Sequence, residues 1–167
     1  MIIPAVHPQK TSKEAFGTYV HFVTYVPLGR SKGSGAVPAL PELPVILVVE
    51  DEELLQSLVE ETLSDGGFEP VIAASGEEAV TLLKRNKGKY RALVTDINLK
   101  GKMDGWEVAQ HAREIEPEFP VVYMSGAAAA AWTSKGVPNS IMLSKPFAPA
   151  QLLTAVSNLL NSGTPTA

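Results

Sequence analysis

Polar residues follow the apolar segments of this 167-residue sequence, and together they are suited to phosphoryl transfer. Glu50 and Asp51 directly follow the run VILVV, and Asp96 closes RALVTD. Ser125 closes PVVYMS, and Lys145 follows a fifth segment of the same kind. Carboxylates brought together repel each other and raise one another's pKa unless a cation shares their site. Mg²⁺ suits such a site because it binds few protein carboxylates together with phosphate oxygens and water.

Transfer of a phosphoryl group to a carboxylate is chemistry that these residue types support. The transfer needs charge neutralisation and positioning more than covalent help from the protein. Mg²⁺ on one side and the Lys145 ammonium on the other would supply the neutralisation. The Ser125 hydroxyl would donate a hydrogen bond to a phosphoryl oxygen.

Each of these residues has a simpler explanation when it is taken alone. Asp51 is equally well explained as the cap of a following helix, and Asp104 is better explained as a cap than as a ligand. Asp96 and Ser125 are types that occur often in turns, and a single lysine such as Lys145 is usually solvated. The functional interpretation therefore depends on the conjunction of these residues at successive strand ends.

Apolar segments of strand length alternate with helical patterns from residue 45 onward. We expect strands at 45–49, 68–74, 91–96, 120–125 and 140–143, and helices at 51–65, 75–86, 104–115, 127–134 and 149–160. Such alternation predicts a parallel sheet with helices on both faces, and ligands bind beyond the carboxyl ends of strands in this architecture. The polar residues that close the strands should therefore meet at one edge of the sheet.

The composition excludes several classes of protein. A net charge of −4 offers no broad basic surface for nucleic acid. The absence of cysteine excludes disulfides and thiol catalysis and is compatible with a reducing, cytoplasmic location. No apolar run reaches the roughly 18 residues that suggest a membrane span, so no membrane contact is expected. The N-terminus also lacks the pattern of a secretory signal.

Residues 1–42 differ from the rest of the chain because they carry scattered proline and glycine and more basic than acidic residues. We expect 1–42 to be a poorly structured, flexible extension and linker, 43–162 to be the folded domain, and 163–167 to be a C-terminal tail. Within the extension only Tyr19–Val26 has strand character. A flexible leader and a docking segment that adds a strand to a sheet edge both remain open.

Four motifs resemble the successive signatures of response-regulator receiver domains: VILVVEDEELL, LVTDINLKGKMDGWEVA, VVYMSG and LSKPF. The resemblance covers about residues 44–161, and the joint pattern is far more specific than any one motif. It implies an α/β, flavodoxin-like (βα)5 three-layer sandwich with a five-stranded parallel sheet in the order 2-1-3-4-5.

The resemblance also implies a role for each polar residue. Glu50 and Asp51 would be the acidic pair that binds Mg²⁺, and the backbone carbonyl of Asn98 would be a further ligand. Asp96 would bind the metal and accept the phosphoryl group. Ser125 would be the switch hydroxyl, Lys145 would contact the phosphoryl group, and Pro146 would follow a cis peptide bond.

Three features depart from the family pattern. Glu50 stands where an aspartate is commoner. The loop INLKGKMDG is one residue longer than the common form and lacks its proline, as in stand-alone receivers and receivers fused to histidine kinases. Met142 stands where the family usually has a tyrosine or phenylalanine that swings inward on activation, and a flexible thioether can fill that space.

These features predict a single-domain response regulator that takes its phosphoryl group from a histidine kinase or a histidine phosphotransfer protein. It would catalyse only its own phosphorylation and dephosphorylation, so it is not a conventional enzyme. We expect no output domain after the last helix of this sequence. The signal should therefore leave through contacts with a downstream protein, and a homodimer through the last strand and helix is a further expectation.

Two alternatives belong to different classes. The first is a receiver-like adaptor that binds its partners constitutively, without phosphorylation; Met142 and the altered loop favour it. The second is a flavodoxin-like enzyme for a small ligand, which is disfavoured because acids replace the glycine-rich phosphate loop after the first strand.

Overall fold

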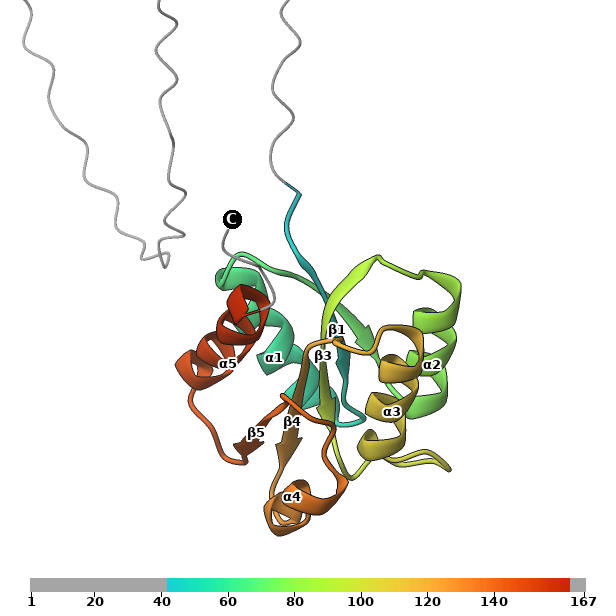
Figure 1. Cartoon of the computed structure of the whole chain (residues 1–167). Helices are drawn as coiled ribbons and strands as arrows, with labels where there is room; N and C mark the ends of the chain where they lie inside the picture. The colour runs from blue at the N-terminus through green and yellow to red at the C-terminus, as the bar shows by residue number, and fades with distance from the viewer. Residues whose placement is uncertain (1–41, 163–167) are drawn as a thin grey trace, which may run out of the picture. The chain divides into compact units, whose positions relative to one another are not determined.

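A parallel five-stranded sheet forms the centre of the computed structural model, which describes residues 42–162 (Figure 1). The strands are β1 (Val45–Val49), β2 (Glu69–Ala73), β3 (Tyr90–Asp96), β4 (Val121–Ser125) and β5 (Ile141–Ser144). Their order in the sheet is β2-β1-β3-β4-β5, which confirms the predicted order. The strand predicted at Tyr19–Val26 and the predicted N-terminal extension lie outside the described residues.

Helices cover both faces of the sheet, as predicted. α1 (Glu53–Asp65) and α5 (Pro149–Ser162) lie together on one face, and α2 (Gly76–Arg85) and α3 (Gly105–Ile115) lie together on the other (Figure 1). A short 3₁₀ helix, η1 (Ala128–Ala131), leads into α4 (Trp132–Lys135) before β5. Within residues 42–162, no helix combines the length and the apolar character that crossing a membrane would require.

Two apolar cores explain why the strands appear as continuous hydrophobic runs. Successive residues of a strand point to opposite faces of the sheet. In β1, Leu47 and Val49 belong to the core under α2 and α3, whereas Ile46 and Val48 belong to the core under α1 and α5. Because both faces are covered, every central position favours an apolar side chain, and the polar residues lie at the strand ends.

Side chains cap the starts of α2 and α3, and the Asp104 cap confirms the prediction from the sequence. The Ser75 hydroxyl accepts a hydrogen bond from the Glu78 backbone N–H at 3.2 Å, at the start of α2. Asp104 and Glu107 form a complete capping box at the start of α3. The second of these caps fixes the helix that follows the Asp96 loop.

The start of α1 differs from the prediction, which placed it at residue 51. The Glu50 carboxylate accepts hydrogen bonds from the backbone N–H groups of Asp51 and Glu52. The N-cap position is Glu52, which has extended backbone and no side-chain cap hydrogen bond, and the helix begins at Glu53. Asp51 is therefore not the cap of α1, and the simpler explanation of that residue is wrong.

The segment between β4 and β5 also differs in detail. A single helix was expected at 127–134, but the chain forms the 3₁₀ turn η1 followed by the four-residue α4. β5 begins at Ile141 rather than residue 140. The Ser140 hydroxyl instead accepts a hydrogen bond from Trp132 Nε1 at 3.0 Å and donates one to the Val137 carbonyl at 2.6 Å.

Candidate functional site

Three carboxylates converge at the carboxyl end of the sheet. Glu50 and Asp51 follow β1, and Asp96 ends β3. β1 and β3 are adjacent and parallel, with Val49 opposite Thr95, so the residues that follow reach the same edge. One oxygen from each of the three carboxylates lies within 4.8 Å of the others. The structure thus brings together the acids that the sequence analysis singled out.

Lys145 joins this cluster from the other side. Its Nζ lies 2.8 Å from Glu50 Oε2 and 3.1 Å from Asp96 Oδ2. Its backbone N–H donates to the Ser125 carbonyl at 2.8 Å, which ties the residue to the end of β4. The Lys145–Pro146 peptide bond is cis, as the family resemblance implied.

The ammonium of Lys145 is held in its charged form. Partial burial acts to lower its pKa, but the hydrogen bond to Glu50 and the negative charges of Asp96 and Glu50 outweigh that effect. The pKa of Lys145 is therefore raised above its ordinary value. A positive charge is present beside Asp96 throughout the physiological pH range.

Glu50 is the most deeply buried of the three acids, with 1% of its surface exposed. Its Oε1 accepts hydrogen bonds from two backbone N–H groups, and its Oε2 pairs with Lys145. The Gln56 side chain from α1 donates to the Glu50 carbonyl at 2.7 Å. Both carboxylate oxygens thus have partners, and the residue fixes the position of the lysine.

Asp51 pairs with a second lysine that the sequence analysis did not single out. Both Nζ and the backbone N–H of Lys100 contact Asp51 Oδ2, at 3.0 Å and 3.3 Å. Burial acts to raise the pKa of Asp51, but the hydrogen bonds and the charge of Lys100 outweigh it and hold that pKa below its ordinary value. A hydrogen bond across 49 residues of sequence offers no local signal by which it could be predicted.

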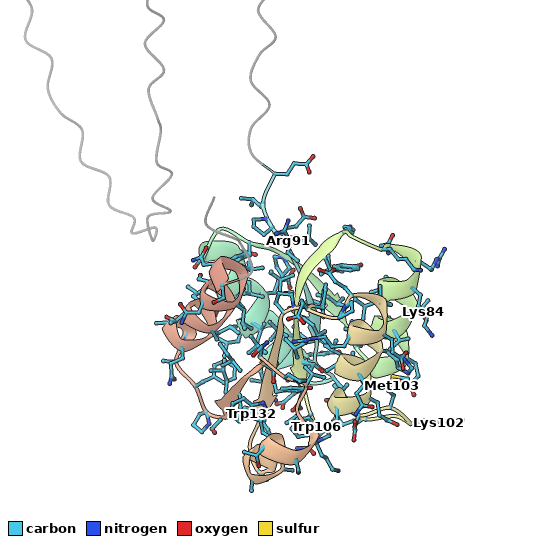
Figure 2. The ribbon with its side chains drawn as sticks, in the orientation of Figure 1. Lys84, Arg91, Lys102, Met103, Trp106 and Trp132 are labelled. Carbon is cyan, nitrogen blue, oxygen red and sulfur yellow. The ribbon has the colours of Figure 1, made fainter. Side chains whose placement is uncertain are left out.

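The loop from 97 to 104, which connects β3 to α3, is fastened at several points. The Asn98 backbone N–H donates to Asp96 Oδ1 at 3.3 Å, and that of Lys102 donates to Glu77 Oε1 at 2.9 Å. Gly101, with φ of 143°, makes the turn between Lys100 and Lys102. Figure 2 shows Lys102 at the outer end of this loop, and Arg91 at the opposite end of the domain. The metal-ligand role of the Asn98 carbonyl stays a prediction.

Gly105 is a second residue that sequence reasoning missed. A Cβ at this position would collide with the Asp96 carbonyl oxygen and lie 2.8 Å from Ile97 Cα. The Gly105 N–H donates to the Ile97 carbonyl at 3.0 Å. The start of α3 therefore packs directly on the backbone of Asp96, and only a residue without a side chain permits that approach.

Ser125 lies on β4, the strand next to Asp96, and Met142 lies one strand further out, on β5. Ser125 ends β4, where Met124 is opposite Asp96; it is fully buried, and its hydroxyl accepts from the Ala127 N–H at 3.3 Å. Met142 in β5 lies opposite Tyr123 in β4. Tyr123 therefore places an aromatic ring on the strand next to Met142, the position where this sequence departs from the family pattern.

Tyr123 is wholly buried and connects the sheet to the segment before β5. Its ring packs on Trp106 with centroids 4.6 Å apart. Its hydroxyl accepts a hydrogen bond from the Val137 N–H at 3.2 Å. The side chain thus links β4, α3 and the α4–β5 connection.

The donor set fits a hard divalent cation. Glu50, Asp51 and Asp96 offer oxygen ligands only, and Mg²⁺ is bound in proteins by a small number of such carboxylates with water completing its shell. The Lys145 ammonium leaves the cluster negatively charged. The arrangement can therefore bind Mg²⁺ and stabilise negative charge that arrives beside Asp96.

Comparisons with known proteins agree with this site. The family model for the response regulator receiver domain matches residues 46–157. A response regulator receiver protein from Sinorhizobium medicae WSM419 is similar in structure, with a TM-score of 0.70 and 49% identity over 72% of this chain and 97% of that one. The receiver domain of the hybrid histidine kinase CckA gives a TM-score of 0.59 at 30% identity, over 70% of this chain and 98% of that one.

Curated relatives are longer proteins. The probable transcriptional regulator ycf29 of Porphyra purpurea is 31% identical over 119 residues, which are 69% of this chain and 56% of that protein. This chain thus spans about half the length of that relative.

Proposed function

Because this chain belongs to the response regulator receiver domain family, we propose that it is a Mg²⁺-dependent phosphoryl acceptor with Asp96 as the nucleophile. Receiver domains are signalling domains of two-component systems rather than conventional enzymes. The observation that carries the proposal is the position of Lys145, whose Nζ lies between Glu50 and Asp96 inside the acidic cluster. We further propose that the protein is a single-domain regulator and that it acts in the cytoplasm.

The reaction would transfer a phosphoryl group from a phosphohistidine of the donor. A carboxylate oxygen of Asp96 attacks phosphorus, the new O–P bond forms as the N–P bond breaks, and the electron pair of that bond stays on the histidine nitrogen. Lys145 stabilises the charge on the phosphoryl oxygens, and the Ser125 hydroxyl donates to one of them. Mg²⁺ held by Glu50, Asp51, Asp96 and the Asn98 carbonyl would neutralise further negative charge.

The donor would be a histidine kinase or a histidine phosphotransfer protein that docks beside the acidic cluster. Leu54 and Leu58 lie one turn apart near the start of α1, with 80% and 41% of their surfaces exposed. Exposed apolar pairs at this spacing suit contact with a helix of another protein. They lie close in sequence to Glu50 and Asp51, so a partner bound there would be near Asp96.

The signal would leave through the face that β5 and α5 share. Ile141 and Leu143 of β5 and Ala155 of α5 contribute to a shallow hollow of about 370 Å³ on that face. A downstream protein, or a second copy of the chain, would cover this apolar surface. The test is whether phosphorylation changes the oligomeric state or the binding of an added partner.

The adaptor hypothesis keeps one specific observation in its favour. Each carboxylate of the cluster already has a lysine partner, Glu50 and Asp96 through Lys145 and Asp51 through Lys100. A cluster in which every acid is paired in this way is stable without phosphate. The adaptor hypothesis predicts that partners bind equally well before and after exposure to a phosphoryl donor.

Intact mass spectrometry distinguishes the two functions. The chain is incubated with Mg²⁺ and acetyl phosphate, and the expected result is a mass gain of one phosphoryl group that Asp96→Asn abolishes. Asp65→Asn, an exposed acid at the end of α1, is the matched control and should still be phosphorylated. If no donor gives an adduct while partner binding persists, the adaptor function is correct.

A further inference from the structure

Two lysines neutralise the acidic cluster in different ways. Lys145 is 19% exposed and is anchored through the end of β4. Lys100 is 82% exposed and approaches from the loop between β3 and α3. Three carboxylates against two ammonium groups leave a single net negative charge at the cluster. That charge is small for a site that is to bind a divalent cation.

The backbone of Lys100 and its side chain both hold this residue beside Asp51. Its N–H and its Nζ contact the same oxygen, Oδ2 of Asp51. On one side of it the loop is tied to Asp96 through the Asn98 N–H, and on the other it is tied to Glu77 through the Lys102 N–H. The ammonium therefore stays near Asp51 even though its long side chain is exposed.

Building on the proposed function, we propose that Lys100 competes with Mg²⁺ for Asp51 and so sets the Mg²⁺ concentration at which the site fills. An ammonium on Oδ2 repels a divalent cation at the same oxygen, and its removal raises the net negative charge that attracts the metal. Exposed ion pairs are weak, so the ammonium is displaced at high Mg²⁺ and does not block the site. Lys100 thus acts on the metal through Asp51 and is not itself a ligand.

Lys102 provides a matched control because it carries the same charge in the same loop. In the part of the chain that the structure describes, no ion pair joins its ammonium to the three carboxylates. Figure 2 shows its side chain at the outer end of the loop. Replacing it tests the long-range effect of one positive charge without the contact to Asp51.

The experiment is an NMR titration of the isotopically labelled full chain with MgCl₂ at fixed ionic strength, followed through backbone amide shifts. The variants are Lys100→Met, Lys100→Arg and Lys102→Met. We expect Lys100→Met to bind Mg²⁺ about three- to tenfold more tightly. Lys100→Arg and Lys102→Met should stay within about twofold of the wild type, and the gain in Lys100→Met should shrink in added salt.

Three outcomes overturn the inference. Equal tightening in Lys100→Met and Lys102→Met would show a general charge effect, and unchanged affinity in Lys100→Met would show no competition. Absence of Mg²⁺ binding in all four proteins would overturn it as well. A phosphorylation assay on the same samples separates the two proposals. Mg²⁺ binding that responds to Lys100 without any phosphoryl adduct would refute the proposed function and leave the role of Lys100 standing.

Discussion

Lys145 Nζ and Glu50 Oε2 lie 2.8 Å apart, although 95 residues separate them in sequence. The glutamate is almost completely buried, and the lysine is the group expected to contact a phosphoryl oxygen. The ion pair therefore connects the end of β1 to the end of β5 across the acidic cluster. Its removal should affect both the stability of the domain and the position of the lysine.

We expect Glu50→Gln to lower the free energy of unfolding by about 1–3 kcal/mol, because it leaves a partly buried ammonium with a weaker partner. Urea unfolding measures the change. Glu52→Gln, at the exposed N-cap position of α1, is the control and should change stability by less than about 0.5 kcal/mol. Equal effects in the two variants would contradict a special role for the buried pair.

Gly105→Ala should destabilise the domain by about 1–3 kcal/mol, because the added Cβ collides with the backbone of Asp96 and Ile97. The collision should also displace the backbone of the acceptor Asp96, and we therefore expect slower phosphorylation by acetyl phosphate. Gly126→Ala is the stability control, because its Cβ would meet no atom within 4 Å. A Gly105→Ala protein as stable as Gly126→Ala would show that α3 adjusts at no cost.

Tyr123→Phe should lower the free energy of unfolding by about 1–3 kcal/mol, because the buried Val137 N–H loses its acceptor. We also expect it to reduce the response of residues 136–140 to beryllofluoride, measured by hydrogen exchange, since the hydroxyl links that segment to β4. Phosphorylation itself should continue. Tyr90→Phe, a buried tyrosine at the start of β3, is the control and should respond as the wild type does. A normal response in Tyr123→Phe would exclude the hydroxyl as the link.

Leu54→Ser should slow transfer from a phosphorylated histidine phosphotransfer domain by about tenfold, because an exposed apolar contact is lost. Transfer from acetyl phosphate should be unchanged, since a small donor needs no docking surface. Leu43→Ser removes another exposed leucine, before the start of β1 and so away from the cluster, and should affect neither reaction. If Leu54→Ser slows both donors equally, the residue acts on the site rather than on docking.

The sheet and the three acids of the cluster were predictable from the sequence because those features have local signatures. Apolar runs mark the buried strands, and a polar residue such as Asp96 that closes a run marks the edge where strands end. Asp104 is predictable as a cap because the capping box has a fixed spacing.

The contacts of Lys100 and Gly105 could not be predicted in the same way. They depend on how the loop after Asp96 folds back, and no local pattern encodes that path. The start of α1 was misplaced for a related reason. The Glu50 carboxylate bonds to the two N–H groups that follow it, so the helix begins only at Glu53, and the spacing of apolar residues does not reveal this contact.

The placement of α1 and α5 on one face of the sheet has a consequence for the timing of signalling. The helices that carry the two proposed surfaces are next to each other, so a bound protein larger than one helix would extend over both. A donor bound over α1 and a target bound over α5 would then compete for the same space. We expect the donor and the target to bind in sequence, so that the donor must dissociate before the phosphorylated domain can bind its target.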